Sequence, residues 1–211
     1  MVIRYPNGQI YSQNQSQAKH TQSSKEKQRL AVDFSNRGMR FEEAINISND
    51  YYLNHQLAVV HKKPTPIQIV KVDYPRRSAA VIKEAYFKEA STTDYNGVYK
   101  GFYLDFEAKE TQNKTSFPFK NFHSHQIEHM KSCLAQSGIC FVLLWFSSLN
   151  RCFFLDSAHL ITHWDLQKST GKKSLSLSLI EEIGIEIVPG IAPRIPYLEA
   201  VQKYLEDKGV L

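Results

Sequence analysis

The sequence contains no apolar run long enough to cross a membrane. The longest one, ICFVLLWF at residues 139–146, covers eight residues, whereas a membrane-spanning helix needs about 20. The opening stretch, MVIRYPNGQIYSQNQSQAKH, also lacks the apolar segment of a secretory signal peptide. We therefore expect a cytoplasmic protein rather than a membrane-bound or secreted one.

Cysteine is scarce as well. The 211 residues include only Cys133, Cys140 and Cys152, which show no CxxC spacing and lie in or beside apolar segments. An odd number of cysteines without such spacing argues against both a disulfide framework and a zinc ribbon. The pattern is typical of buried thiols in a reducing compartment.

Motifs of zinc proteases and nucleotide hydrolases are also missing. His125 and His129 fall on one face of a predicted helix, as do His159 and His163, but neither pair forms HExxH or has an evident third ligand. The glycines of the chain form no phosphate-binding loop. We therefore expect neither a zinc site nor nucleotide hydrolysis.

Positive charge is present in modest excess, and it is unevenly distributed. The net charge is +5, of which residues 1–30 carry +4 and residues 61–88 carry +5, so that the rest of the chain is at −4. Two basic segments beside a mildly acidic remainder favour a polyanionic partner such as nucleic acid. The alternative is a solubilising tail together with a solvated surface.

The composition predicts one folded domain preceded by a tail. Residues 6–29 are rich in Gln, Ser, Asn and Lys and nearly free of apolar side chains, so they cannot bury enough surface to offset the entropy of ordering. We predict a flexible basic tail over residues 1–30 and a single domain over residues 31–211.

The domain carries an unusual insertion at about residues 63–90. Pro64, Pro66 and Pro75 bracket an extended segment at 67–74, and a helix is predicted at about 79–89. We interpret the insertion as a protruding basic stalk.

The remaining elements alternate between helical and strand patterns. A central mixed sheet flanked by helices, an α/β fold, is the architecture that this order favours. The expected helices cover residues 38–53, 124–138 (closed by Gly138), 157–168, 175–183 and 195–207, and the expected strands cover residues 57–62, 139–146, 151–156 and 184–189.

Two turn placements compete in the acidic stretch TTDYNGVYKGFYLDFEAKET, residues 92–111. Asn96-Gly97 has the stronger local turn chemistry, because both residues tolerate positive φ, but it leaves few residues for the first strand. Lys100-Gly101 lets both strands reach eight or more residues. We favour this second turn because it places the apolar side chains on one face and the polar ones on the other.

This register places Asp94 opposite Glu107, with Lys109 on the same face. Like charges in opposed positions destabilise a sheet by ~0.2–1 kcal/mol, and burial increases the cost unless a pKa rises or a cation binds. Closely spaced carboxylates suit Mg²⁺, with Mn²⁺ as a substitute. The pattern favours metal-assisted phosphodiester hydrolysis, in which Asp105 and Glu110 have no role. A solvated hairpin face with an incidental Glu-Lys pair is the alternative.

The stretch STTDYNGVYKGFYLDFEAKET resembles the signature of the RecU family of Holliday junction resolvases, in the PD-(D/E)xK nuclease superfamily. NRGMRFEEAI at 36–45, VDYPRRSAAVIKEAYFKEAST at 72–92, FHSHQIEHM and CFVLLWF resemble the same family, in the expected order. One departure from the superfamily name is that Thr93, not proline, precedes Asp94. The resemblance implies a restriction-endonuclease-like core and a Mg²⁺-dependent homodimer that nicks four-way DNA junctions symmetrically in recombination and repair.

The resemblance also implies roles for individual residues. Asp94 and Glu107 become metal ligands, and Lys109 becomes the residue that orients water or stabilises charge. Glu43 on the first helix matches a position that often supplies another carboxylate, although the neighbouring Glu42 is an alternative. Gln126 matches a polar residue that holds the metal, its water or a phosphate.

The expected DNA contacts lie outside this cluster. Arg37, just before the first helix, is placed to reach a phosphate, and the stalk enters the junction centre. Its expected backbone contacts and its aromatic residues for stacking on unpaired bases are Lys62, Lys71, Arg76, Arg77, Tyr74 and Tyr86.

Further partners and two rival functions are also predicted. The expected partners are four-way junction DNA, a second copy of the chain, the strand-exchange recombinase and a branch-migration helicase. The rivals are a non-catalytic module that binds junctions or the recombinase, and a nuclease of the same superfamily with another specificity.

Overall fold

The computed structural model describes residues 40–74, 80–88 and 92–210. The predictions for the tail at 1–30, for Arg37, and for Arg76 and Arg77 lie outside these residues. None of the helices within the described ranges is both long and apolar enough to span a bilayer.

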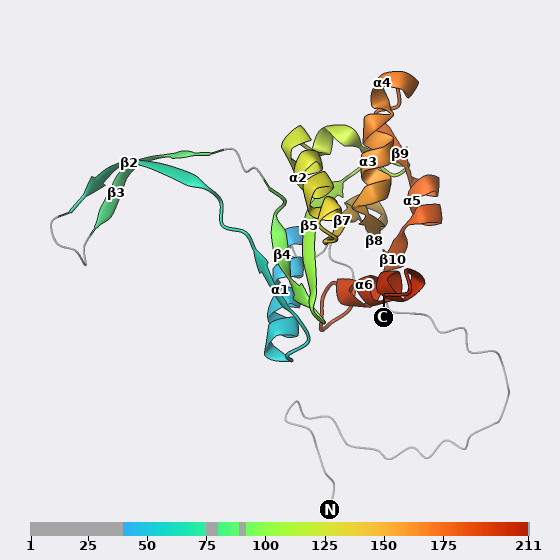
Figure 1. The fold of residues 1–211 in the computed structure, drawn as a ribbon, viewed down its shortest axis with the longest axis horizontal. Coiled ribbons are helices and arrows are strands. Elements are labelled where there is room, and N and C mark those ends of the chain that lie inside the picture. Colours follow the sequence, from blue (N-terminus) through green and yellow to red (C-terminus); the bar gives the residue numbers. More distant parts are fainter. Residues whose placement is uncertain (1–39, 75–79, 89–91, 211) are drawn as a thin grey trace, which may run out of the picture. The chain divides into compact units, whose positions relative to one another are not determined.

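A mixed six-stranded sheet forms the centre of the fold (Figure 1). Strands β5 and β7 pair in parallel, whereas the other neighbours pair antiparallel. The predicted α/β architecture with a mixed sheet is therefore confirmed. In spatial order the strands are β1 (Val59–Lys62), β4 (Tyr95–Tyr99), β5 (Phe102–Thr111), β7 (Ile139–Phe146), β8 (Arg151–Asp156) and β10 (Ile185–Ile187).

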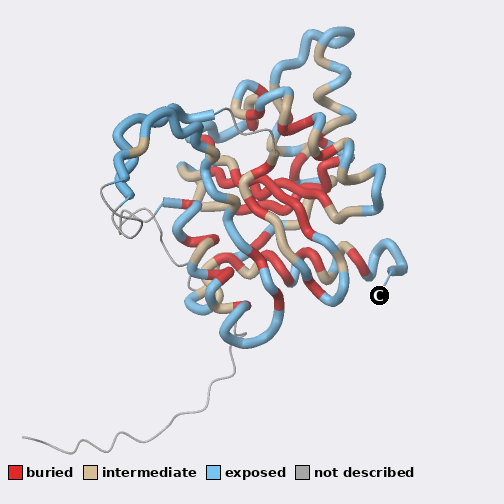
Figure 2. Tube along the Cα trace, turned by 60° about the vertical axis from the view of Figure 1, so that its left-hand side comes forward, coloured by how far each residue is buried: buried red, intermediate tan, exposed pale blue. Residues whose placement is uncertain are grey.

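Strand β7 shows why its sequence is apolar without interruption: helices cover both faces of the sheet. Phe141, Leu143 and Trp145 face α1 (Phe41–Asn54) and α6 (Tyr197–Asp207) in one apolar cluster. The alternate residues of β7 join a second cluster on the other face, which contains α2 (Ser124–Ala135), α3 (Ser157–Asp165) and α5 (Leu177–Ile183). Figure 2 shows the strands between these layers as the buried centre of the fold.

The second half of the insertion is a strand, so the predicted helix at 79–89 is wrong. β3 (Val81–Phe87) pairs antiparallel with β2 (Ile67–Asp73), whose extended structure was predicted correctly. β-Branched and aromatic residues at both ends of β3 favour the extended form. This β2–β3 ribbon is exposed along almost its whole length (Figure 2).

A small two-stranded sheet was not predicted. β6 (Ser116–Pro118) pairs antiparallel with β9 (Ser174–Ser176). The predicted helix at 175–183 therefore begins later, at Leu177, where the Ser176 hydroxyl accepts a hydrogen bond from the Leu179 amide. Serine prefers this capping position over the helix interior, which explains the later start.

The end of α2 also differs from its prediction. Ser137, with φ of 63°, occupies the left-handed position expected of Gly138. The Ser137 amide donates to the Leu134 carbonyl and the Gly138 amide to the Cys133 carbonyl, which is the Schellman pattern. A Cβ on Gly138 would lie 3.0 Å from the Cys133 oxygen, so glycine is favoured here by the close approach of the backbone rather than by its φ.

The hairpin turn lies at Lys100-Gly101, as predicted. Both residues have positive φ, 49° and 85°, and β4 pairs with β5 in the predicted register, for example Asn96 with Asp105. Gly97 lies instead within β4, where the backbone of β1 passes close by. A Cβ there would be 2.2 Å from the Val59 oxygen, so only glycine fits.

These two glycines are expected to respond differently to substitution. We expect Gly97→Ala to lower the free energy of unfolding by at least ~2 kcal/mol, because the new methyl group displaces β1 from the sheet. Gly101→Ala adds a methyl group in open space and should cost only about 1 kcal/mol, for its positive φ. Urea denaturation of both variants measures this difference, and equal losses would contradict the crowding argument.

Candidate functional site

Strand β5 carries the central groups of the site on one face. Asp105, Glu107 and Lys109 alternate with the apolar Leu104, Phe106 and Ala108, which face the α1–α6 side. The charged residues therefore face the α2 side of the sheet, since alternate residues share a face. Asp105 and Glu107 are both fully buried, although their nearest charged partners differ.

Glu107 has an incompletely satisfied carboxylate. Its Oε2 accepts a hydrogen bond of 3.1 Å from the backbone amide of Asp94. Its Oε1 lies 2.7 Å from Lys109 Nζ in an ion pair, yet accepts no hydrogen bond of good geometry from any described residue. Burial is the main cause that raises the pKa of Glu107 to about 8, and the neighbouring Asp94 raises it further. Lys109 lowers this pKa but does not outweigh the other two effects.

Asp94 lies beside Glu107, as the register predicts. It immediately precedes β4, is half-buried, and is held by its backbone on both sides. Its amide donates to Glu107, and its carbonyl accepts a 2.7 Å hydrogen bond from the Lys63 amide. The local backbone of Asp94 is therefore fixed relative to β5, next to a buried carboxylate whose pKa is raised.

Asp105, which the sequence interpretation left without a role, is the most heavily bonded carboxylate of the site. It accepts hydrogen bonds from Lys63 Nζ at 2.8 Å, from Tyr103 Oη at 2.9 Å and from the Thr93 hydroxyl. Burial alone would raise the pKa of Asp105, but the hydrogen bonds from Lys63 and Thr93 outweigh it and lower the pKa. Strict alternation with Glu107 and Lys109 was the signal that could have revealed this residue.

Asp105 also approaches His129 and Cys133 on α2, and the ligand atoms of all three lie within 4.8 Å of one another. His129 Nε2 is 3.2 Å from Asp105 Oδ1. The ammonium group of Lys63 already supplies a cation to this carboxylate, however, and hydrogen bonds occupy both of its oxygens. Glu107 is likewise paired with a lysine, but its Oε1 accepts no hydrogen bond from the described residues, so Glu107 is the better fit for a divalent ion.

Gln126, Glu42 and Glu43 each have different surroundings in the structure. Gln126 is buried on α2, but its Oε1 accepts a 3.1 Å hydrogen bond from the His123 amide and so caps the helix. Glu42 pairs with Lys62 at 2.5 Å. Glu43 is exposed, and within the described residues it makes no ion pair or side-chain hydrogen bond.

The ribbon carries the remaining described candidates for DNA contact. Lys71, Tyr74 and Tyr86 are exposed, the two tyrosines by 69% and 61%. The Tyr86 hydroxyl donates to Glu84 at 2.8 Å, while both aromatic rings remain available to a ligand.

The similarity of this chain to known proteins identifies its family. A family model described as Recombination protein U matches residues 36–203. The chain belongs to the RecU family. It is 59% identical over 207 residues to the Holliday junction resolvase RecU of Lactiplantibacillus plantarum, with 98% of each chain covered. It is 54% identical over 202 residues to the protein of the same name from Bacillus subtilis, with 96% of this chain and 95% of that one covered.

The raised pKa of Glu107 gives this RecU-family chain a testable pH dependence. Because the pKa in the folded protein exceeds the ordinary value of 4.5, the stability that it contributes is complete below pH 4.5 and is lost as the pH rises through about 8. In EDTA we expect the melting temperature to fall by on the order of 5–10 °C over this range. A bound divalent cation should reduce the decline, because it favours the carboxylate form.

Glu107→Gln provides the control, since the amide has nearly the same shape and does not titrate. Its melting temperature in EDTA should vary much less between pH 5 and pH 9. If this variant shows the wild-type slope, another group is responsible.

Proposed function

We propose that the chain is a Holliday junction resolvase, a divalent-metal-dependent endonuclease that nicks four-way DNA junctions symmetrically in recombination and repair. Its membership of the RecU family and the names of its relatives support this function. The observation that carries the site assignment is the buried Glu107 carboxylate, which has one oxygen without a hydrogen bond and lies beside Asp94.

Mg²⁺ is the ion that we propose for the site, with Mn²⁺ as a substitute. Asp94 and Glu107 would hold it, and Gln126 would contribute if its side chain exchanged the His123 amide for the ion. These are hard oxygen donors, which Mg²⁺ prefers. When bound, such an ion polarises the scissile phosphate and lowers the pKa of a nearby water.

Lys109 is proposed to orient the attacking water and to stabilise the negative charge that develops on the phosphate. Lys109 follows Glu107 by two residues on β5 and so lies on the same face. Its ammonium group is already 2.7 Å from the Glu107 carboxylate. A fixed positive charge in a buried site is effective because little solvent screens it. For Glu43 we retain the proposed accessory role, since the alternative residue, Glu42, already pairs with Lys62.

DNA recognition is proposed to involve the β2–β3 ribbon. Its exposed apolar and aromatic side chains, such as Ile69, Tyr74 and Tyr86, suit stacking or packing against the unpaired centre of a junction. Lys62 and Lys71 would contact the phosphate backbone, as would Arg37, Arg76 and Arg77. Recognition of this kind depends on the shape of the junction rather than on its sequence.

We propose a homodimer, because two symmetric nicks require two copies of a site that the described residues form once. The strand-exchange recombinase and a branch-migration helicase are further proposed partners, and the cytoplasm is the proposed location. The two rival functions make different predictions: a pure binding module requires no metal for DNA processing, and a sequence-specific nuclease would cut linear duplex as well as junctions.

Asp94→Asn tests the assignment directly. On a synthetic four-way junction with Mg²⁺, the wild-type protein should make paired nicks. The variant should bind the junction with similar affinity but cut it at least roughly 100-fold more slowly, because one metal ligand has lost its charge. Gel-shift and single-turnover cleavage assays measure the two properties.

Glu110→Gln is a matched control, since it neutralises an exposed carboxylate on β5, whose side chain makes no ion pair or hydrogen bond within the described residues. It should cut at the wild-type rate. Normal cleavage by Asp94→Asn would show that the site is wrongly assigned.

A further inference from the structure

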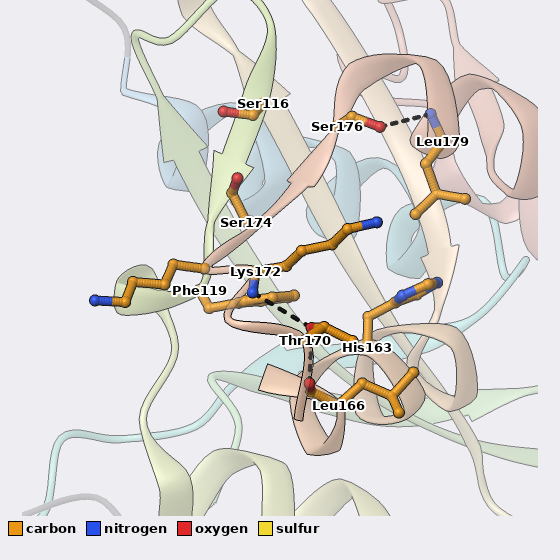
Figure 3. A pocket seen from close by; sticks show the side chains of 10 residues that line it. Ser116, Phe119, His163, Leu166, Thr170, Lys172, Ser174, Ser176 and Leu179 are labelled. Atoms are coloured by element: carbon orange, nitrogen blue, oxygen red, sulfur yellow. Dashed lines mark hydrogen bonds between the residues drawn. The ribbon is translucent and has the colours of Figure 1, made fainter. Parts of the chain in front are cut away.

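Two adjoining hollows lie where the β6–β9 sheet meets the end of α3. One has a volume of about 380 Å³ and the other of about 570 Å³, and they share Ser116, Phe119, Lys173 and Ser174. Figure 3 shows the residues around the first hollow, which come from β6 and the following turn, from α3 and the adjoining α4 (Gln167–Thr170), and from β9 and α5.

The walls of these hollows are strongly basic. Lys120, Lys168, Lys172 and Lys173 line them, and no Asp or Glu does. All four lysines are exposed, and within the described residues none forms an ion pair. Asp165, the acidic residue at the end of α3, is instead paired with Lys131 at 3.1 Å. The positive charge of the hollows is therefore not neutralised by the fold.

The rest of the lining suits a phosphate ester. The hydroxyl groups of Ser116, Ser174 and Ser176 line the hollows together with the lysines, while the buried Phe119 and the partly buried Leu179 form apolar parts of the wall. Arginine, which holds a single phosphate in a fixed bidentate geometry, is absent from both linings. Several flexible lysine point charges instead suit a series of phosphates along a backbone.

The hollows are connected directly to the candidate catalytic strand. Asn121 ends the turn that contains Lys120 (Phe119–Asn121), and its side-chain amide donates a 3.2 Å hydrogen bond to the carbonyl of Glu110, the residue after Lys109. The same chain segment runs from Lys109 on β5 to Gln126 on α2. A DNA strand that passes the candidate active site thus has a basic surface adjacent to it.

We propose that these lysine-lined hollows, together called the β6–β9 basic surface, bind the phosphodiester backbone of a junction arm next to the cleavage site. This contact is separate from the β2–β3 ribbon and rests on the proposed function. It positions the duplex without reading bases, as phosphate contacts do. An acidic segment of a partner protein would be a different occupant, and the test below separates the two.

The test compares two double variants with the same change in net charge. Lys172→Gln/Lys173→Gln alters the β6–β9 basic surface. Lys203→Gln/Lys208→Gln alters α6, which packs on the opposite face of the sheet. The binding constant of a four-way junction is measured between 50 and 300 mM salt, conditions chosen because each phosphate contact contributes about −0.9 to the slope of log K against log salt.

We expect Lys172→Gln/Lys173→Gln to make this slope shallower by roughly 1–2 and to weaken binding about tenfold at moderate salt. Lys172→Arg/Lys173→Arg should keep the wild-type slope, and the α6 variant should change it little. At saturating protein, the α6 variant should cut at the wild-type rate, because it alters neither the candidate catalytic site nor the β6–β9 basic surface.

The outcomes distinguish this proposal from the proposed function. Equal slopes for the β6–β9 and α6 variants would overturn the proposal, even if the wild-type protein cuts junctions normally, and would leave an acidic protein as the candidate occupant. A cleavage rate of Lys172→Gln/Lys173→Gln that falls at saturation without a change in slope would also overturn it. Failure of the wild-type protein to cut a junction would instead count against the resolvase function itself.

Discussion

The partly buried ion pair between Lys63 and Asp105 is the contact on which the candidate site depends. Lys63 follows β1 at the base of the β2–β3 ribbon, and Thr93 lies where the chain returns to β4. Both side chains converge on Asp105, in the middle of the sheet. Removal of Lys63 would leave the fully buried Asp105 without its cation, which is destabilising, so the base of the ribbon and the candidate catalytic strand hold each other in place.

Asp105 and Glu107 are acidic residues two positions apart whose pKa values shift in opposite directions. Both are fully buried on one face of β5. Asp105 has three hydrogen-bond donors and a lowered pKa, whereas Glu107 has one backbone donor, an ion pair with Lys109 and a raised pKa. Each carboxylate has a lysine beside it, but hydrogen bonds satisfy both oxygens of Asp105, whereas Oε1 of Glu107 accepts none from the described residues and is left for a ligand. That difference separates a structural acid from a candidate metal ligand.

The sequence was sufficient where one physical rule dominated. Separation of apolar from polar side chains determined the hairpin register, and with it the proximity of Asp94 and Glu107. Prediction from the sequence failed where tertiary contacts decided the structure. The ribbon strand β3 looked helical because its exposed faces show no alternation of burial, and no local signal indicated that Gln126 would cap its own helix or that Lys63 would reach across β4 to Asp105.

The adjacent Lys62 and Lys63 have a consequence for how such chains can vary in length. Consecutive residues of a strand point to opposite faces, and accordingly Lys62 pairs with Glu42 on the α1 side while Lys63 pairs with Asp105 on the other. Insertion or deletion of one residue within β1 would exchange the two lysines and leave Asp105 buried without its cation. A change of length in the ribbon beyond residue 63 would leave both pairs intact, whereas one in the strand that leads into it would not.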